Sequence, residues 1–349
     1  MKKLITLIIT FAVYISCTST PAIKHTTESS SARSIAVLEK VNLGGLDQWI
    51  SIRGQDADKP ILLYLHGGPG SAEMPMVRHY NNGLEKDFIM VVWDQRGAGK
   101  SFSSSIPKES MNIAQFISDT HELTTLLKDR FGKNKIFIMG HSWGSLLGMF
   151  VINKYPDDYF AYIGIGQYVN GTENELVSYN FALSEAEKRG DKSAIEDLRE
   201  IGPPVNGLYA GDWFQGLLIQ RKYLGKFGGQ IYNTDNVEFF KVTMFSPEYS
   251  LFDNIFYVRG IMFSVKSMGP EIVACNLETQ VPSVKIPVFF FCGRYDYSTP
   301  LEIVERYCKN IDAPKKKIIY FENSAHMMNF EEPDLFMEMV REKFLLLVE

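Results

Sequence analysis

The stretch that most constrains this chain runs from Gly140 to Gly144 and reads Gly-His-Ser-Trp-Gly. It follows the apolar run 135–139 and precedes an apolar stretch, 145–151, that predicts a helix. A strand, a tight turn and a helix with serine at the apex form a nucleophile elbow, in which side chains in place of the flanking glycines would collide with the neighbouring strand and helix. The pattern predicts Ser142 as a nucleophile, and an ordinary strand-to-helix turn is the alternative.

The composition indicates a large globular fold. The chain has 349 residues, of which 45% are hydrophobic and 13% aromatic, enough to bury a sizeable core in one domain or in one domain with an insertion. The net charge is -5, and no basic stripe interleaves with aromatic residues, which argues against nucleic acid as a partner. A small-molecule or short peptide substrate is expected instead.

The first residues form a separate segment. Positive charge at Met1–Lys3 precedes the apolar run 4–15, which is too short for a stable membrane-spanning helix of about 20 residues. We interpret residues 1–17 as an export signal that ends in a site similar to the one where bacterial lipoproteins are lipidated on cysteine, here Cys17. This predicts a lipid-anchored protein of the bacterial cell envelope, and the alternative is a secreted or uncleaved protein with an incidental cysteine. Residues 18–34 are rich in Ser and Thr and predict a solvated tether.

Strand and helix patterns alternate beyond the tether. Residues 35–55 contain a Gly44-Gly45 pair between alternating stretches, which predicts two antiparallel strands joined by a turn. Residues 112–131 have helical spacing, and continuous apolar runs predict strands covered on both faces. The alternation predicts an α/β fold, with a parallel sheet between helices. The predicted buried strands are 60–65, 88–93, 135–139, 159–165, 287–292 and 317–321.

A long insertion interrupts this alternation. We predict a core of residues 35–167 and 284–349, and a helical insertion at 168–283 that begins with helices at 173–189 and 193–201. An insertion between strands of one sheet lies over their carboxyl ends, so it is a candidate lid over a substrate pocket.

Aromatic residues are frequent in this insertion. Trp213 and Phe214 are candidates for substrate contact. We interpret most of the others, at positions 239–240, 252 and 256–257, as side chains that only hold the insertion together.

Two further residues complete a possible catalytic set. Asp296 and His326 each follow a buried strand, which places them at the same edge of the sheet as Ser142. The order of nucleophile, acid and histidine along the chain is that of an α/β-hydrolase. Two other histidines, His66 and His141, flank turns at this edge, and we interpret them as bracing loops.

Two glycine-rich turns also lie at strand ends. The turn at 66–70 leaves backbone N–H groups uncovered, and such a group near a nucleophile forms half of an oxyanion hole. The turn at 97–101 has part of a phosphate-binding motif but lacks its first glycine. We interpret it as a structural turn in which Asp94 and Arg96 tie adjacent loops together.

Three motifs together carry a resemblance to a known family. His-Gly-Gly-Pro-Gly at 66–70, Asp-Gln-Arg-Gly-x-Gly-x-Ser at 94–101 and Gly-x-Ser-Trp-Gly-Ser at 140–145 make residues 35–349 similar to the proline iminopeptidase branch of the α/β-hydrolase superfamily. The resemblance implies an eight-stranded, mostly parallel sheet, a helical cap after the sixth strand, and no metal or organic cofactor. It also implies a triad of Ser142, Asp296 and His326, with the backbone N–H groups of Gly68 and Trp143 as oxyanion donors.

The expected reaction follows from these roles. A serine hydrolase would cleave a small amide or ester through an acyl-enzyme, and N-terminal aminopeptidase activity is favoured over carboxylesterase activity. An aminopeptidase must bind an ammonium group, and Glu173 and Glu175 of the cap are candidate partners. His141 stands where the branch commonly has glycine. A non-catalytic binding protein on the same fold is the remaining alternative.

Overall fold

The computed structural model describes residues 18–23, 33–232 and 237–347. The predicted export signal and Cys17 therefore lie outside the described residues. Within the described ranges, no helix combines the length and the apolar character that a bilayer-crossing segment requires.

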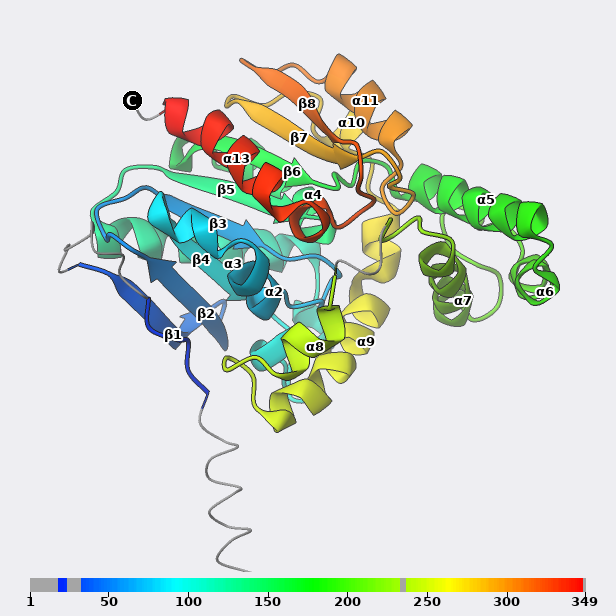
Figure 1. Cartoon of the computed structure of the whole chain (residues 1–349), viewed down its shortest axis with the longest axis horizontal. Helices are drawn as coiled ribbons and strands as arrows, with labels where there is room; N and C mark the ends of the chain where they lie inside the picture. The colour runs from blue at the N-terminus through cyan, green and yellow to red at the C-terminus, as the bar shows by residue number, and fades with distance from the viewer. Residues whose placement is uncertain (1–17, 24–32, 233–236, 348–349) are drawn as a thin grey trace, which may run out of the picture.

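An eight-stranded sheet forms the centre of the molecule, in the order β1-β2-β4-β3-β5-β6-β7-β8 (Figure 1). Strand β1 (Ile35–Leu43) pairs antiparallel with β2 (Leu46–Gly54), and β2 pairs antiparallel with β4. All later neighbours are parallel. The predicted eight-stranded, mostly parallel sheet is confirmed. The remaining strands are β3 (Ile61–Leu65), β4 (Ile89–Asp94), β5 (Ile136–His141), β6 (Tyr159–Ile165), β7 (Val288–Gly293) and β8 (Lys316–Phe321).

Helices cover both faces of the sheet, because the central strands are apolar on both sides. One face packs against α3 (Ile113–Phe131), α4 (Trp143–Lys154) and α11 (Leu301–Asn310). The other packs against α2 (Met74–Tyr80) and α13 (Pro333–Phe344). The shorter helices of the core are η1 (Asn82–Lys86), η2 (Gly99–Ser101), η3 (Lys108–Ser110), η4 (Pro156–Asp158), α10 (Leu277–Gln280), α12 (Met328–Glu331) and η6 (Leu345–Leu347).

The insertion after β6 forms a helical cap with two parts (Figure 1). One part has its own apolar core and contains α5 (Gly171–Arg189), α6 (Lys192–Ile201) and α7 (Trp213–Lys226). The other contains α8 (Phe239–Met244) and α9 (Leu251–Val273). Of the cap aromatics that we interpret as holding the insertion together, Tyr257 is buried, whereas Phe240 and Phe252 are 71% and 61% exposed, so the interpretation is wrong for these two. Phe256 is partly exposed, and its ring centroid lies 6.3 Å from that of Phe102.

A short stem joins the cap to the core. Asn170 and Asn276 form an antiparallel bridge. The backbone N–H of Gly171 donates to the carbonyl of Cys275 at 3.0 Å, and that of Leu277 donates to the carbonyl of Val169 at 2.8 Å. The chain therefore leaves the core and returns to it at one place.

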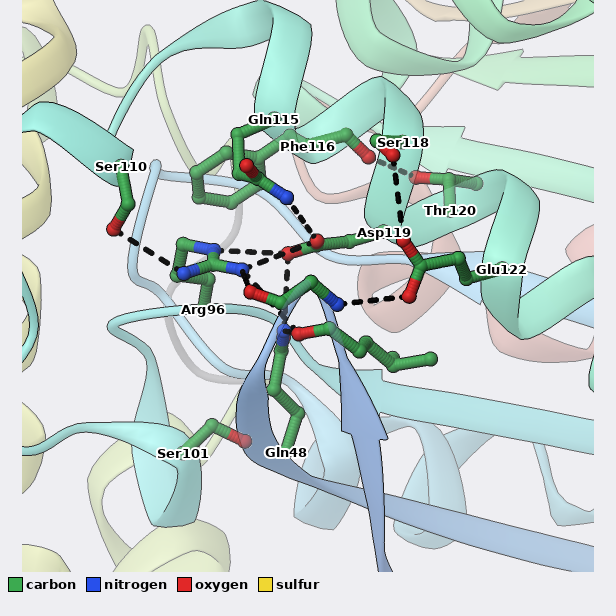
Figure 2. A network of polar contacts seen from close by, with 12 residues as sticks. Gln48, Arg96, Ser101, Ser110, Gln115, Phe116, Ser118, Asp119, Thr120 and Glu122 are labelled. Atoms are coloured by element: carbon green, nitrogen blue, oxygen red, sulfur yellow. Dashed lines mark hydrogen bonds and ion pairs between the residues drawn. The ribbon is translucent and has the colours of Figure 1, made fainter.

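Arg96 ties three segments together at the edge of the core (Figure 2). Its guanidinium donates to both carboxylate oxygens of Asp119 in α3, at 2.9 and 3.1 Å. It also donates to the carbonyls of Leu43 and Gly44, at the turn between β1 and β2. Asp94 accepts from Tyr249 of the cap at 2.9 Å. The prediction that Asp94 and Arg96 tie adjacent loops together is confirmed.

The described part of the predicted tether lies against the folded body. Lys100 Nζ donates to Thr18 Oγ1 at 2.9 Å, and Arg53 Nη1 donates to Thr20 Oγ1 at 2.6 Å. Residues 18–23 thus differ from the expectation of a segment held only by solvent, since their hydroxyl groups find cationic partners on the core.

The three cysteines of the described ranges, Cys275, Cys292 and Cys308, are buried and unpaired. Cys292 lies inside β7, as its apolar surroundings in the sequence predict. Burial raises the pKa of its thiol well above the ordinary value, so the sulfur behaves as a small apolar core group.

Candidate active site

Ser142 lies at the turn between β5 and α4, with φ 54° and ψ -118°. A positive φ is rare for a residue with a side chain and is held in place by the surrounding structure. A Cβ at Gly140 would lie 2.1 Å from the carbonyl oxygen of Gly144, and one at Gly144 would lie 2.2 Å from that of Leu65. Both glycines are therefore required by close packing, as expected of a nucleophile elbow.

Asp296 and His326 meet at the carboxyl ends of β7 and β8. The Nδ1–H of His326 donates to Asp296 Oδ2 at 2.8 Å, and both side chains are buried. Asp296 also accepts from the backbone N–H groups of Ser298 and Thr299, at 2.8 and 2.9 Å, and from the Thr299 hydroxyl at 2.7 Å. These bonds fix the carboxylate, and with the Nδ1 proton engaged, Nε2 of His326 is left as the atom that accepts a proton.

Ser142 and His326 line the same cavity of about 310 Å³, together with Gly68 and Trp143. The structure thus brings the predicted nucleophile, base and oxyanion donors to one place. Apolar cap residues close the cavity from the other side, among them Leu217, Ile261, Val265 and Ile272.

Gly166, just after β6, lies directly beneath the acid–base pair. A Cβ at this glycine would lie 2.7 Å from His326 Nδ1 and 3.3 Å from Asp296 Oδ2, and its φ is 53°. The absence of a side chain here allows the imidazole to reach the carboxylate.

The proposed oxyanion donors are held by a buried network. Gly68 has a φ of 112°, and Trp143 begins α4, so its N–H has no acceptor within the helix. Gln95 bridges the two turns, since its Nε2 donates to the His66 carbonyl at 3.1 Å and its Oε1 accepts from Trp143 Nε1 at 2.9 Å. His66 in turn donates through Nδ1 to the carbonyl of Gly67 at 2.7 Å. Burial lowers the pKa of His66 to about 4, so it braces the loop as a neutral ring.

His141 forms a buried ion pair with Glu73. Its Nδ1–H donates to Glu73 Oε1 at 2.7 Å, and its Nε2–H donates to the backbone carbonyl of His326 at 3.1 Å. Both ring nitrogens face acceptors, which requires the doubly protonated, charged imidazolium. The second oxygen of Glu73 accepts from the Tyr64 hydroxyl at 2.5 Å. The interpretation of His141 as a loop brace is confirmed.

Glu73 is the functional-site residue that sequence reasoning missed. It lines the cavity beside Ser142 and His141. It stands just before α2, outside every recognised motif. One indication of this role is present in the sequence: Glu73 is the charged residue in the otherwise apolar stretch 72–77, which follows the glycine-rich turn at 66–70 after β3.

The predicted cap residues fall in three different settings. Phe214 lines the main cavity. Glu175 and Trp213 line an adjoining cavity of about 80 Å³, and Glu175 accepts from Arg221 at 3.0 Å. Arg221 lines both cavities.

Glu173 lies elsewhere and is not among the lining residues of either cavity. It accepts from Arg306 of α11 at 2.8 Å, so it holds the cap to the core. Among the described residues, Glu73 is thus a glutamate that lines the cavity of Ser142, and Glu175 one that lines the adjoining cavity.

Comparison with known proteins agrees with this architecture. Residues 60–333 match the family described as alpha/beta hydrolase fold. The chain is 38% identical over 312 residues to the Probable aminopeptidase YbaC of Bacillus subtilis, covering 87% of this chain and 95% of that one. It is 26% identical over 300 residues to the proline iminopeptidase of Saccharolobus solfataricus, covering 80% and 83%.

Solved structures show the same fold at lower sequence identity. The proline iminopeptidase of Mycobacterium smegmatis aligns with a TM-score of 0.58 and 16% identity, covering 89% of this chain and 98% of that one. A 2-hydroxy-6-oxo-6-phenylhexa-2,4-dienoate hydrolase from Rhodococcus aligns with a TM-score of 0.60 and 20% identity, covering 89% and 99%. By its sequence match, its sheet and its elbow, the chain belongs to the α/β-hydrolase family, in its proline iminopeptidase-like branch.

Proposed function

We propose that the protein is a serine hydrolase that cleaves a small amide through an acyl-enzyme, and that its substrates are short peptides with a free N-terminus. The observation that carries the proposal is the placement of Ser142 at positive φ in the same cavity as His326, which is bonded to Asp296. A serine is a weak nucleophile until an adjacent base takes its proton.

The chemistry assigns one role to each group. His326 takes the proton of the Ser142 hydroxyl as its oxygen attacks the substrate carbonyl, and Asp296 stabilises the imidazolium that forms. The N–H groups of Gly68 and Trp143 compensate the charge on the carbonyl oxygen, and loss of one such donor typically costs about 2.7–4 kcal/mol of barrier. His326 then protonates the leaving amine, and a water molecule releases the acyl group by the reverse sequence.

The names of the relatives support the aminopeptidase reading. A free ammonium needs an anionic partner in a largely apolar cavity. Glu73 supplies a carboxylate close to the nucleophile: a Cβ at Gly67 would lie 3.2 Å from Ser142 Cβ and 3.4 Å from Glu73 Oε1. Glu175 supplies another in the adjoining cavity.

A carboxylesterase is the second candidate function. Glu73 and Glu175 already hold cationic partners, His141 and Arg221. A neutral ester substrate needs no further carboxylate, so this pairing favours the alternative.

The serine mechanism is tested with a fluorophosphonate probe. Wild-type protein is expected to be labelled, and Ser142→Ala is expected to lose the label while keeping its circular dichroism spectrum. Ser193→Ala is the control, because Ser193 is exposed on α6 and is not among the residues that line the cavity, so this variant should keep the label. Persistent labelling of Ser142→Ala would refute the assignment, and an unlabelled wild type would favour a non-catalytic binding protein.

The substrate class is tested with a panel of aminoacyl naphthylamides, their N-blocked forms and short acyl nitrophenyl esters. An aminopeptidase hydrolyses the free forms and not the blocked ones. Equal rates on free and blocked amides would overturn the aminopeptidase assignment, and turnover of esters alone would assign the protein to the esterase class.

A further inference from the structure

The outer face of the α8–α9 part of the cap is apolar. Surface helices normally turn polar side chains to solvent, and large exposed apolar patches mark interaction sites. Here the large apolar side chains are between 36% and 78% exposed, and four of them are spaced as i, i+4, i+7 and i+11 along α9. We call this set the apolar cap face; it consists of Phe240, Phe245, Leu251, Phe252, Ile255, Phe256, Val258 and Met262.

The inner face of α9 is fixed to the core. The Tyr257 hydroxyl donates to the carbonyl of Ala72 at 2.9 Å, and Ser264 Oγ donates to the carbonyl of Gly97 at 3.1 Å. Helix α8 is joined to α9 by the bond from Asn254 Nδ2 to the Met244 carbonyl at 3.1 Å. The apolar cap face is therefore the outer surface of a firmly seated helix pair.

The N-terminal segment reaches the molecule at this same place. The Ser19 N–H donates to the carbonyl of Pro247 at 3.0 Å, in the loop between α8 and α9. Lys100 Nζ donates both to Thr18 Oγ1 and to Asp253 Oδ2, in the first turn of α9, at 2.9 and 2.8 Å. Thr18 directly follows Cys17 and the apolar run 4–15. The chain would thus join either anchor, a lipid on Cys17 or the apolar run itself, at a point next to the apolar cap face.

Cationic side chains border the apolar cap face. Lys108 and Lys266 line a surface hollow together with Met262, and Arg259 lies on α9 with its guanidinium 5.6 Å from the Phe256 ring centroid. Among the residues that the structure describes, none of these three cations is paired with a carboxylate, and Lys266 Nζ lies 4.7 Å from the Phe214 ring centroid. Cations beside an exposed apolar surface suit the anionic headgroups of a bilayer.

We propose that the apolar cap face rests on a lipid bilayer that contains anionic phospholipid, and that the N-terminal anchor holds it there. The outer side chains of α9 enter the boundary between headgroups and acyl chains, as those of an interfacial amphipathic helix do. The same helix lines the active-site cavity through Ile261, Met262 and Val265. Met262 belongs both to this lining and to the apolar cap face, so the cavity lies next to the proposed membrane surface. The proposal is independent of the reaction that the cavity supports.

Tryptophan substitution in the full-length chain tests which face touches lipid. Phe252→Trp and Ile255→Trp place an indole on the apolar cap face, and Leu346→Trp is the matched control, because Leu346 is similarly exposed, 66% against 61% for Phe252, and lies near the C-terminus. Each variant is bound to phosphatidylethanolamine–phosphatidylglycerol vesicles with plain or brominated acyl chains. Bromolipid should quench the added emission at positions 252 and 255 and leave that at 346 unchanged.

Other occupants of the apolar cap face give other outcomes. Equal quenching at positions 252 and 346, or none at 252 in protein that floats with the vesicles, would overturn the proposal.

Sedimentation in mild detergent provides a second test. A dimer that Phe252→Glu dissociates would assign the face to a second copy of the chain. Protection of the indole at position 252 from aqueous iodide in the monomer without lipid would assign it to the chain's own apolar run.

Discussion

Nδ1 of His141 lies 2.7 Å from Oε1 of Glu73, and both side chains are almost completely buried beside the proposed nucleophile. Burial would lower the pKa of His141, but the charge and the hydrogen bond of Glu73 outweigh it and the pKa is raised. Burial would likewise raise the pKa of Glu73, but His141 outweighs it and the pKa is lowered. Each group therefore stabilises the charged form of the other.

This pairing predicts a pH-dependent stability. The raised pKa of His141 contributes stability below the imidazole's unfolded pKa of about 6.5, and this is lost as pH rises through the folded value. The lowered pKa of Glu73 contributes stability above its unfolded value of about 4.3, and this is lost as pH falls through the folded value. Glu73→Gln should therefore cost most between these two pH values, about 3–5 kcal/mol.

Urea unfolding of wild type and Glu73→Gln across pH measures this difference. Glu85→Gln is the control, because Glu85 is also buried, 6% exposed against 1% for Glu73, and its partner at 2.6 Å is an arginine, Arg53, in place of a histidine. The cost of Glu73→Gln should shrink on the alkaline side and that of Glu85→Gln should not. Parallel curves for the two variants would contradict an ion pair at His141.

The positive φ of Ser142 predicts that glycine is more stable than alanine at this position. Ser142 has a φ of 54°, a conformation that glycine adopts without penalty. Ser142→Gly should be more stable than Ser142→Ala by about 1–2 kcal/mol, while neither variant reacts with the fluorophosphonate probe. Thermal unfolding of both proteins provides the comparison, and equal stabilities would mean that the turn stores no such strain.

Gly166 offers a test of the acid–base geometry. A methyl group there would lie 2.7 Å from His326 Nδ1, so Gly166→Ala should displace the imidazole and lower kcat about 100-fold. Gly190→Ala is the matched control, because Gly190 also has a positive φ, 65°, but a Cβ there meets no atom within 4 Å. The two variants should lose similar stability through backbone strain, and Gly190→Ala should keep its kcat. Equal losses of kcat in Gly166→Ala and Gly190→Ala would show that the contact with His326 does not cause the loss.

Alanine substitutions of Gln95 and Gln48 distinguish a loss of stability from a loss of kcat. Each is a buried glutamine that accepts from a tryptophan indole, Trp143 at 2.9 Å and Trp93 at 3.1 Å. Alanine at either site leaves the indole N–H unpaired and should cost about 1–3 kcal/mol of stability. Gln95→Ala should also lower kcat about tenfold or more, because it loosens the turn that carries the proposed oxyanion donor Gly68. Steady-state kinetics of the two variants decides this, and a kcat loss in Gln48→Ala of the same size would point to general destabilisation.

The sequence predicted the parts of the site that local patterns define. Ser142 and Asp296 follow the buried strands β5 and β7. His326 follows β8, where the prediction of a strand buried on both faces is wrong, because β8 lies at the edge of the sheet and Lys316, Lys317 and Tyr320 are exposed. All three strands are parallel and end at one side of the sheet, so the meeting of the three residues follows from topology.

Glu73 was missed because its partner His141 is 68 positions away and no motif links them. Glu173 and Glu175 could not be told apart, because their spacing alone does not say which one Arg306 or Arg221 holds.

The cap posed a different difficulty. Its helices at 171–189 and 192–201 match the predicted ones closely. The signals that start and end a helix, which are capping residues and the spacing of apolar residues, lie within the helix or directly beside it and can be read from the sequence. The direction in which Phe252 points depends on how α9 sits on the core through Tyr257 and Ser264. Such packing between distant segments leaves no periodic signal in a single chain.

The stem formed by Asn170 and Asn276 has a consequence for how such a protein can change. Because the two ends of the insertion are bonded neighbours, a short linker can join them without altering the order of the strands. The residues between them then form a segment that can be replaced while Ser142, His326 and Asp296 keep their places at the strand ends. The cap residues that line the cavity and the apolar cap face can thus be replaced together, in one piece, without a change in the residues that follow the strands.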